Sequence, residues 1–266
     1  MIHPTAVVHP KAQLHPTVRV GPFALIDEGA VLGEECVVGP YARITGQTIL
    51  GARNRIYDGA VIGGEPQDLK YKNEPTRIRI GDDNVFREHV TVNRPTTVEG
   101  ETILGSNNFL MANCHIGHNC LVGNHVIIAN GASLGGHVTV QDRAFISGNC
   151  LVHQFTRVGA VAMMQGGAAI SKDLPPFTIA TGVNSICGLN AVGLRRAGFT
   201  VEERMEVKRL YHALFRSGRN LRPAVEEAQQ FVSGQAGRAF LKFISESKRG
   251  VCTEDSPVVA EIVDKD

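Results

Sequence analysis

Residues 20–50 read VGPFALIDEGAVLGEECVVGPYARITGQTIL, and every sixth residue from Val20 to Leu50 is Val, Ile or Leu. The same spacing holds from Ile2 to Ile170, where 25 of 29 such positions are Ile, Val or Leu and the exceptions are Asp68, Glu74, Phe86 and Met164. Amphipathic helices repeat at about 3.6 residues and isolated amphipathic strands at about two. A period of six fits neither, so the pattern predicts a solenoid of short repeats.

A second track of small residues lies four positions after each large aliphatic, as at Ala24, Ala30, Cys36, Ala132 and Ala144. Glycine often follows the aliphatic directly. Each repeat therefore offers one large inward residue, a tight corner and one small inward residue. Three such repeats make one triangular coil, so that positions eighteen apart in the sequence lie above one another. Stacked coils are predicted to form parallel sheets about 4.8 Å apart around a continuous aliphatic core.

Two polar stretches interrupt the repeat: GGEPQDLKYKNEPTRIR at 63–79 and RPTTVEGE at 94–101. Insertions in a solenoid leave it as loops, often on the binding side. The period ends near residue 172, and Thr200 with Glu203 then fits a helical capping box, while Pro223 suits the first turn of another helix. We predict a β-helix over 1–189 with loops at 63–79 and 94–101, a helical domain over 190–250, and a loosely ordered acidic tail over 251–266.

Charge and hydropathy exclude several classes of protein. The net charge is +1, which gives no argument for binding nucleic acid. No apolar run approaches the roughly 18 residues of a membrane span, and the N-terminus MIHPTAVVHP does not resemble a signal peptide. We therefore expect a cytoplasmic protein without stable membrane insertion. The charge is uneven, since residues 190–250 hold 12 Lys and Arg against 6 Asp and Glu. This basic end suits an acidic partner or an ordinary solvated surface.

The six cysteines are predicted to be structural. Four of them occupy the small inward track, where they replace alanine: Cys36, Cys114, Cys120 and Cys150. Buried cysteines behave as small hydrophobes, and free thiols agree with a cytoplasmic location. Cys187 and Cys252 lie outside the repeat and have no predicted role.

Histidines gather at one predicted corner, because residues eighteen positions apart stack on successive coils. The repeats that begin at Ile116, Leu134 and Val152 place together His118, Gly136, His137, His153 and Gln154, with His115 close by. Three interpretations compete. Neutral imidazoles bind zinc, as in the β-helical γ-class carbonic anhydrases. An imidazole with a pKa near 6.5 is also a suitable general base, and a glycine N–H beside it is a plausible oxyanion donor. The third interpretation is a solvated surface without chemistry.

Longer motifs resemble one family of hexapeptide-repeat acyltransferases, which are left-handed parallel β-helices. The motifs are GEPQDLKYKNEPTRIRIGDDNVFREHVTVNR, NCHIGHNCLVGNHVIIANGASLGGHV, VHQFTRVG and GLNAVGLRRAGF. Over about residues 1–250 the chain is similar to the UDP-N-acetylglucosamine 3-O-acyltransferases, which begin lipid A biosynthesis. The resemblance implies a homotrimer with active sites between neighbouring solenoids. It also implies an (R)-3-hydroxyacyl donor on acyl carrier protein, a UDP-sugar acceptor, and no metal or further cofactor.

The resemblance also implies roles for individual residues. His118 would deprotonate the sugar 3-hydroxyl, and the backbone N–H of Gly136 would hold the oxyanion. Asp68 and Lys70 would bind the sugar and phosphate, while the basic helical end would meet the carrier protein. Further implied contacts are His115, His137, His153 and Gln154 in the same cleft, Asn190 and Arg196 near the nucleotide, and Gly166 in the acyl groove. An open groove at Gly166 favours a longer acyl chain.

Four positions depart from the family pattern. Asn119 stands where Asp is frequent and Asn93 where His is common, while Val192 replaces a carboxylate and Ala197 replaces an Arg. An amide at 119 is able to orient the His118 ring but cannot stabilise its cation as a charge would. The changes at 192 and 197 bear on the nucleotide contacts. Together they leave a 3-amino sugar open as acceptor, which would yield an amide.

Other functions remain as alternatives. A related sugar-nucleotide N-acyltransferase usually carries a uridine-binding domain ahead of its repeats, whereas here the repeats begin at residue 2. An acetyl-coenzyme A sugar acetyltransferase, a zinc-dependent γ-class carbonic anhydrase and a purely structural solenoid are the others.

Overall fold

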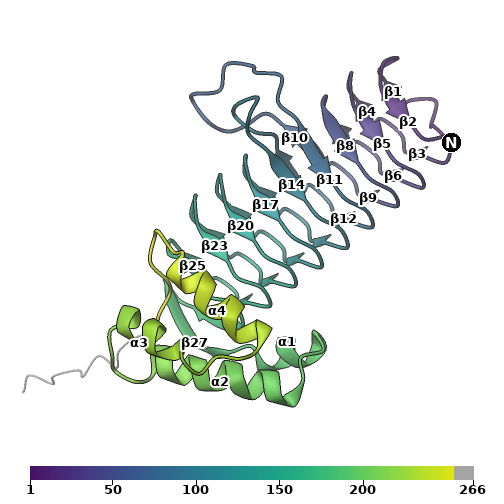
Figure 1. Cartoon of the computed structure of the whole chain (residues 1–266). Coiled ribbons are helices and arrows are strands. Elements are labelled where there is room, and N and C mark those ends of the chain that lie inside the picture. Colours follow the sequence, from purple (N-terminus) through teal and green to yellow (C-terminus); the bar gives the residue numbers. More distant parts are fainter. Residues whose placement is uncertain (255–266) are drawn as a thin grey trace, which may run out of the picture.

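The structure, a computed structural model, describes residues 1–254. It is a left-handed parallel β-helix followed by a group of α-helices, which confirms the predicted fold class (Figure 1). The N-terminus lies at one end of the solenoid and the helices lie at the other (Figure 1). Within residues 1–254 no helix is both long and apolar enough to cross a membrane.

Three sheets form the sides of the triangular solenoid. Sheet 1 consists of β1 (Val7–Val8), β4 (Leu25–Ile26), β7 (Arg43–Ile44), β10 (Val61–Gly64), β13 (Thr91–Asn93), β16 (His115–Ile116), β19 (Ser133–Leu134), β22 (Leu151–Val152) and β25 (Ala169–Ile170). Sheet 2 consists of β2 (Gln13–Leu14), β5 (Val31–Leu32), β8 (Thr48–Leu50), β11 (Ile78–Ile80), β14 (Thr102–Leu104), β17 (Leu121–Val122), β20 (Thr139–Val140) and β23 (Arg157–Val158). Sheet 3 consists of β3 (Arg19–Val20), β6 (Val37–Val38), β9 (Arg55–Ile56), β12 (Val85–Phe86), β15 (Phe109–Leu110), β18 (Ile127–Ile128), β21 (Phe145–Ile146), β24 (Met163–Met164), β26 (Thr178–Thr181) and β27 (Ser185–Leu189).

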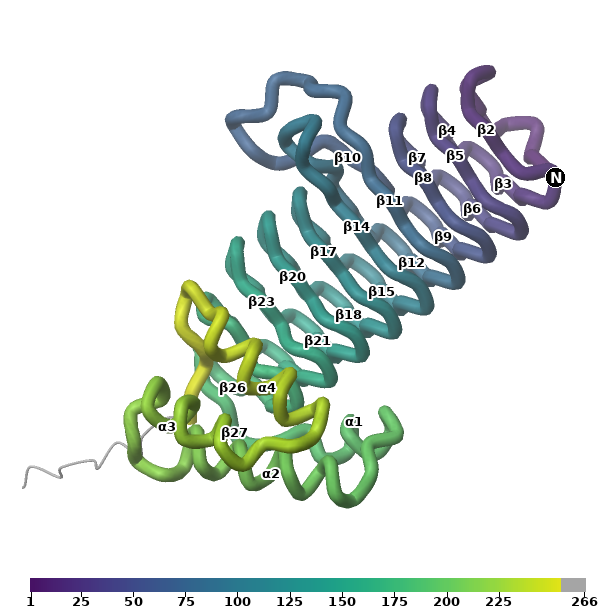
Figure 2. Tube along the Cα trace, viewed as in Figure 1, coloured from purple at the N-terminus to yellow at the C-terminus, as the bar shows by residue number. Residues whose placement is uncertain are grey.

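The strand register shows where the two loops leave. Leu25 pairs with Arg43 and Arg43 pairs with Val61, so the regular step is one coil of three repeats. Val61 pairs with Thr91 and Thr91 pairs with His115, and both of these steps are longer. The first exceeds a regular coil by two repeats and the second by one repeat. Both insertions follow a strand of sheet 1, so both loops leave at the corner between sheets 1 and 2, on one side of the solenoid (Figure 2).

The loop boundaries differ slightly from those predicted. The first loop is shorter, at 65–77, because β10 continues to Gly64 and β11 begins at Ile78. The second spans 94–101, as expected, between β13 and β14. Because both insertions are multiples of six, the aliphatic count passes through them in phase. Val98 therefore fits the pattern although it lies in a loop and is 60% exposed.

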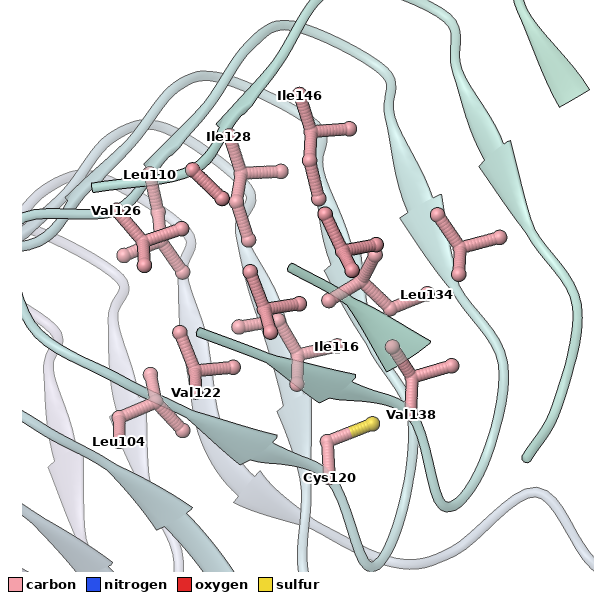
Figure 3. Packing of buried hydrophobic residues seen from close by; sticks show 14 of the residues in the cluster. Leu104, Leu110, Ile116, Cys120, Val122, Val126, Ile128, Leu134, Val138 and Ile146 are labelled. Atoms are coloured by element: carbon pink, nitrogen blue, oxygen red, sulfur yellow. The ribbon is translucent and has the colours of Figure 1, made fainter. Parts of the chain in front are cut away.

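The inward tracks form one continuous core (Figure 3). Large aliphatics and small residues both point inward, including Leu110, Ile116 and Cys120, which are all fully buried. Phe86 and Met164, the exceptions in composition, are buried as well. The four cysteines of the small track are buried, as the register predicts.

Four helices follow the solenoid within the described chain: α1 (Ala191–Arg196), α2 (Val201–Phe215), α3 (Leu221–Ala228) and α4 (Gln235–Ser245). The capping box of Thr200 and Glu203 is present at the start of α2, as predicted. A buried ion pair joins the helices to the solenoid. The Arg157 guanidinium lies 2.8 Å from the Asp173 carboxylate, donates to the Phe243 carbonyl at 2.8 Å, and lies over the ring of Phe243.

The chain after residue 250 is more ordered than expected as far as the structure describes it. Val251 forms a parallel bridge with Asp173, and Thr253 forms one with Ser185. The Glu254 carboxylate accepts hydrogen bonds from the Tyr211 hydroxyl and from Arg216 Nε. The prediction of a loose tail is therefore wrong for 251–254, because backbone pairing and a charged cluster hold this segment. The rest of the predicted tail, 255–266, lies outside the described residues.

Val122 and Val98 occupy the same track, yet Val122 is 3% exposed and Val98 is 60% exposed. Val122→Ala is expected to lower the free energy of unfolding by about 2 kcal/mol, because it removes buried methyl groups and leaves a cavity. Val98→Ala is the matched control, with an expected change below about 0.5 kcal/mol. Urea unfolding of both variants measures the difference, and equal losses would contradict the assignment of Val98 to the loop.

Candidate active site

The corner between sheets 1 and 2 brings the predicted residues together. Ile116 pairs with Leu134 and Leu134 pairs with Val152, so the residues that follow these aliphatics stack on successive coils. Beside them lies a cavity of about 590 Å³ over the outer face of sheet 1. Its wall includes Gln67, Asn93, His115, His118, Gly135, Gly136, Leu151, His153, Gln154, Ser171 and Val183.

The His118 ring lies directly over Gly136. A Cβ at position 136 would be 2.5 Å from both Cε1 and Nε2 of His118, so only glycine leaves room for the ring there. On its other side, His118 Nδ1 is 2.8 Å from Asn119 Oδ1. The ring is therefore held by one nitrogen, and its second nitrogen lies beside a bare backbone.

The N–H of Gly136 is left open, unlike equivalent groups at another corner. Two residues after each core aliphatic, the N–H groups of Ala52, Ser106 and Asn124 donate to a side chain of the next coil, at 2.7–2.8 Å. Gly136 occupies the same position after Leu134. Within residues 1–254 its N–H has no acceptor, and Gln154 of the next coil does not cap it. An uncapped N–H beside an imidazole is suited to stabilise an oxyanion.

Two further histidines border this pair and favour the neutral form. His115 Nδ1 shares a hydrogen bond with Thr91 Oγ1 at 2.7 Å, and burial together with the nearby His118 lowers the pKa of His115. The His137 ring meets His118 edge-on at 5.3 Å and stacks on Phe155 at 4.5 Å. Burial and then His118 lower the pKa of His137, while Asp68 opposes them. Both groups are therefore neutral at neutral pH.

The first loop carries the predicted sugar-binding residues toward the corner. Gln67 lines the cavity, and Asp68 is close enough to His137 to act on its pKa. The Lys70 backbone N–H donates to Asp68 Oδ1 at 3.0 Å, and its side chain is exposed. Leu69, between them, is fully exposed.

Some residues at the site come from segments that the repeat pattern did not indicate. Arg249 Nε donates to the Ser171 carbonyl at 2.9 Å, and its Nη2 is 3.5 Å from His153 Nδ1 at the edge of the cavity. Arg94 Nη2 donates to the Tyr71 hydroxyl at 2.8 Å and so joins the two loops. The only signal in the sequence was the presence of basic residues in irregular segments, which does not identify a partner.

Asn190 and Arg196 lie elsewhere in the same chain. They line a second cavity of about 590 Å³ over the outer face of sheet 3, together with Ile127, Phe145, Met163, Ile179 and Val192. The Asn190 amide is already used, since its Oδ1 caps the Gly193 N–H and its Nδ2 donates to the Val161 carbonyl, both at 2.8 Å. Gly166 is exposed at the corner between sheets 3 and 1, outside the wall of the first cavity. One chain therefore does not unite these residues with His118.

The cysteines and the acidic residues do not offer other chemistry at this corner. Burial raises the pKa of the Cys114 and Cys120 thiols to about 12, which disfavours the nucleophilic thiolate. Among residues 1–254, no three His, Cys, Asp or Glu side chains are grouped as ligands for a metal ion. The corner histidines of a single chain thus do not form a zinc site by themselves.

Comparison with known proteins agrees with this geometry. A family model described as UDP-N-acetylglucosamine O-acyltransferase, domain 2, matches residues 173–252, and one for the bacterial transferase hexapeptide matches 101–136. An acyl-[acyl-carrier-protein]--UDP-N-acetylglucosamine O-acyltransferase from Gloeothece citriformis is 43% identical over 205 residues, which cover 77% of this chain and 74% of the relative. One from Alkalilimnicola ehrlichii is 46% identical over 195 residues, covering 72% of this chain and 76% of the relative.

Solved structures show the same likeness over nearly the whole chain. A UDP-N-acetylglucosamine acyltransferase from Francisella novicida superposes with a TM-score of 0.91 at 37% identity, covering 97% of this chain and 95% of the other. The relatives share sequence, solenoid and helical end with this chain. The chain therefore belongs to the UDP-N-acetylglucosamine O-acyltransferase family.

Proposed function

We propose that this chain transfers an (R)-3-hydroxyacyl group from the thioester of acyl carrier protein to the 3-position of UDP-N-acetylglucosamine, the first step of lipid A biosynthesis. The names of its relatives support the donor and acceptor. The observation that carries the proposal is the His118–Gly136 pair, in which an imidazole lies over an uncapped backbone N–H.

The proposed reaction needs no acyl-enzyme, because a thioester is already activated. His118 Nε2 takes the proton of the sugar 3-hydroxyl as its oxygen attacks the thioester carbonyl. The carbonyl oxygen becomes an oxyanion and accepts a hydrogen bond from the Gly136 N–H. The tetrahedral intermediate then expels the pantetheine sulfur, which receives the proton from His118 and leaves as a thiol. The product is an ester, and the base is restored.

The neighbouring residues suit the acceptor. Asp68 and Lys70 lie in the exposed 65–77 loop, and we assign them to the sugar and its phosphate. His115, His137 and Gln154 would line the sugar site. The lowered pKa values of His115 and His137 keep two positive charges away from the His118 ring, which would otherwise make that ring harder to protonate during proton transfer.

The active form is proposed to be a homotrimer in which two subunits complete each site. Asn190 and Arg196 lie beside the second cavity, over sheet 3 rather than over the His118 corner. A neighbouring copy would place its Arg196 guanidinium near the pyrophosphate bound at the first copy's His118. The outward apolar residues of sheet 3 offer the contact surface: Ile127, Phe145, Met163 and Ile179.

The helical end is proposed to receive the carrier protein. Residues 190–250 carry a net charge of +6, from 12 basic and 6 acidic residues. Acidic partners are attracted to such a surface and associate faster at low salt. Arg249 extends this positive charge to the rim of the cavity, next to His153.

His118→Ala is expected to reduce acyl transfer by at least about a hundredfold, because no other base lies over Gly136. The matched control is His89→Ala, since the His89 ring also lies over a glycine of the preceding coil, Gly59, at a different corner. Turnover of UDP-N-acetylglucosamine with an (R)-3-hydroxyacyl carrier protein is measured, and circular dichroism checks the fold. Retained activity in His118→Ala would refute the assignment of the base.

Mixing two inactive variants tests the shared site. His118→Ala and Arg196→Ala are each expected to be impaired, whereas mixed trimers pair an intact His118 with an intact Arg196 of the neighbour. Random assembly of equal amounts restores about a quarter of the sites, because each site lies at a head-to-tail interface. Activity is assayed after co-expression. No recovery above the two separate variants would contradict a site shared between subunits.

Gly166 is proposed to leave the acyl groove open for a longer chain. A Cβ there would meet only the Gly148 carbonyl oxygen at 3.7 Å, an ordinary contact, so a larger side chain is tolerated. Gly166→Met is expected to shift the product toward shorter acyl groups without loss of stability. Mass spectrometry of products from a mixture of acyl carrier proteins measures the change, and an unchanged profile would exclude Gly166 from the groove.

A further inference from the structure

The 94–101 loop contacts the side chain that holds the His118 ring. The Thr96 backbone N–H donates to Asn119 Oδ1 at 3.2 Å, and the Thr96 hydroxyl donates to the same oxygen at 3.3 Å. On the opposite side, a Cβ at position 100 would be 2.4 Å from Asn119 Nδ2, so Gly100 provides the space for that amino group. Asn119 is thus enclosed by one loop.

The backbone of Asn119 is fixed as well. Its φ of 60° lies in the left-handed region, which asparagine adopts more readily than other residues with a Cβ. Its N–H donates to the hydroxyl of the fully buried Thr102 at 2.8 Å. Side chain and main chain therefore leave the amide a single placement.

These contacts determine the orientation of the amide. A backbone N–H is only a donor, so the Asn119 atom that faces Thr96 must be the oxygen. The same oxygen lies 2.8 Å from His118 Nδ1, and an amide oxygen only accepts. Nδ1 must therefore carry a proton. In the neutral ring the lone pair is then on Nε2, the nitrogen that lies over Gly136.

We infer that Thr96 and Asn119 are positioning residues: Thr96 fixes the Asn119 amide, and Asn119 keeps the His118 proton on Nδ1 so that Nε2 faces the substrate as a base. The catalytic part of this inference rests on the proposed function of His118. The tautomer itself does not, because it follows from the hydrogen bonds alone. A neutral amide performs here the orienting part of the task for which relatives often use a carboxylate.

Nitrogen NMR of the chain labelled with ¹⁵N-histidine tests the tautomer directly, with His118→Ala to assign the signal. Near pH 8, the His118 signals are expected to show a protonated Nδ1 and an unprotonated Nε2. Asn119→Ala is expected to mix the two tautomers and to lower kcat by at least about tenfold while KM changes little. Asn113→Ala is the matched control, since Asn113 has a φ of 61° at another corner.

Two milder variants keep the test valid if Asn119→Ala fails to fold. Thr96→Val removes the hydroxyl but keeps the N–H, so kcat is expected to fall by only about threefold, with Thr97→Val as the exposed neighbour control. Asn119→Asp keeps an acceptor and adds a charge that favours the imidazolium. It is expected to retain the Nδ1 proton and to move the acid limb of the kcat profile upward by about one pH unit.

A proton on Nε2 in the unaltered chain would overturn the inference, and so would an unchanged tautomer and kcat in Asn119→Ala. Absence of acyl transfer by the unaltered chain would instead overturn the proposed function. The two failures are distinguishable because the spectrum is read without turnover.

Discussion

The backbone hydrogen bond from one coil to the next is the interaction on which the rest of this molecule depends. It sets the step of three repeats that aligns Ile116, Leu134 and Val152 in one column. The same step places the imidazole of His118 and the N–H of Gly136 on adjacent coils, about 4.8 Å apart in the strand-to-strand direction. The distance between base and oxyanion donor is therefore a property of the sheet and does not depend on the flexibility of a loop.

The active corner gives up local stabilisation that other corners keep. Elsewhere, side chains such as Asp82 and Asp142 cap the exposed N–H groups of the coil before them. At Gly136 no such cap is present within the described chain, and a buried donor without a partner costs about 1–3 kcal/mol. The surrounding core is able to bear this cost, because the aliphatic columns continue without a break beneath the site. A rigid solenoid and an unsatisfied corner are complementary.

The repeat made the fold and the stacking of the histidines predictable, since both depend only on counting along the chain. The count failed at Val98, where a loop whose length is a multiple of six keeps the pattern in phase without entering the core. Handedness came from resemblance, because a period does not encode it. The contacts of Thr96, Arg94 and Arg249 were missed because they join irregular segments that no period relates. The Asn190 amide is occupied as a helix cap, which the motif alone did not reveal.

The two insertions are two repeats and one repeat long, and together they equal the three repeats of one coil. The chain thus devotes a full turn of sequence to loops without adding any height to the solenoid. Its contour length and its axial length are uncoupled at this one corner. Because whole repeats were displaced, every inward and outward position downstream keeps the phase that it would have in an uninterrupted helix. A gene of this kind is able to gain or lose recognition loops in repeat-sized units while the reading of its core stays unaltered.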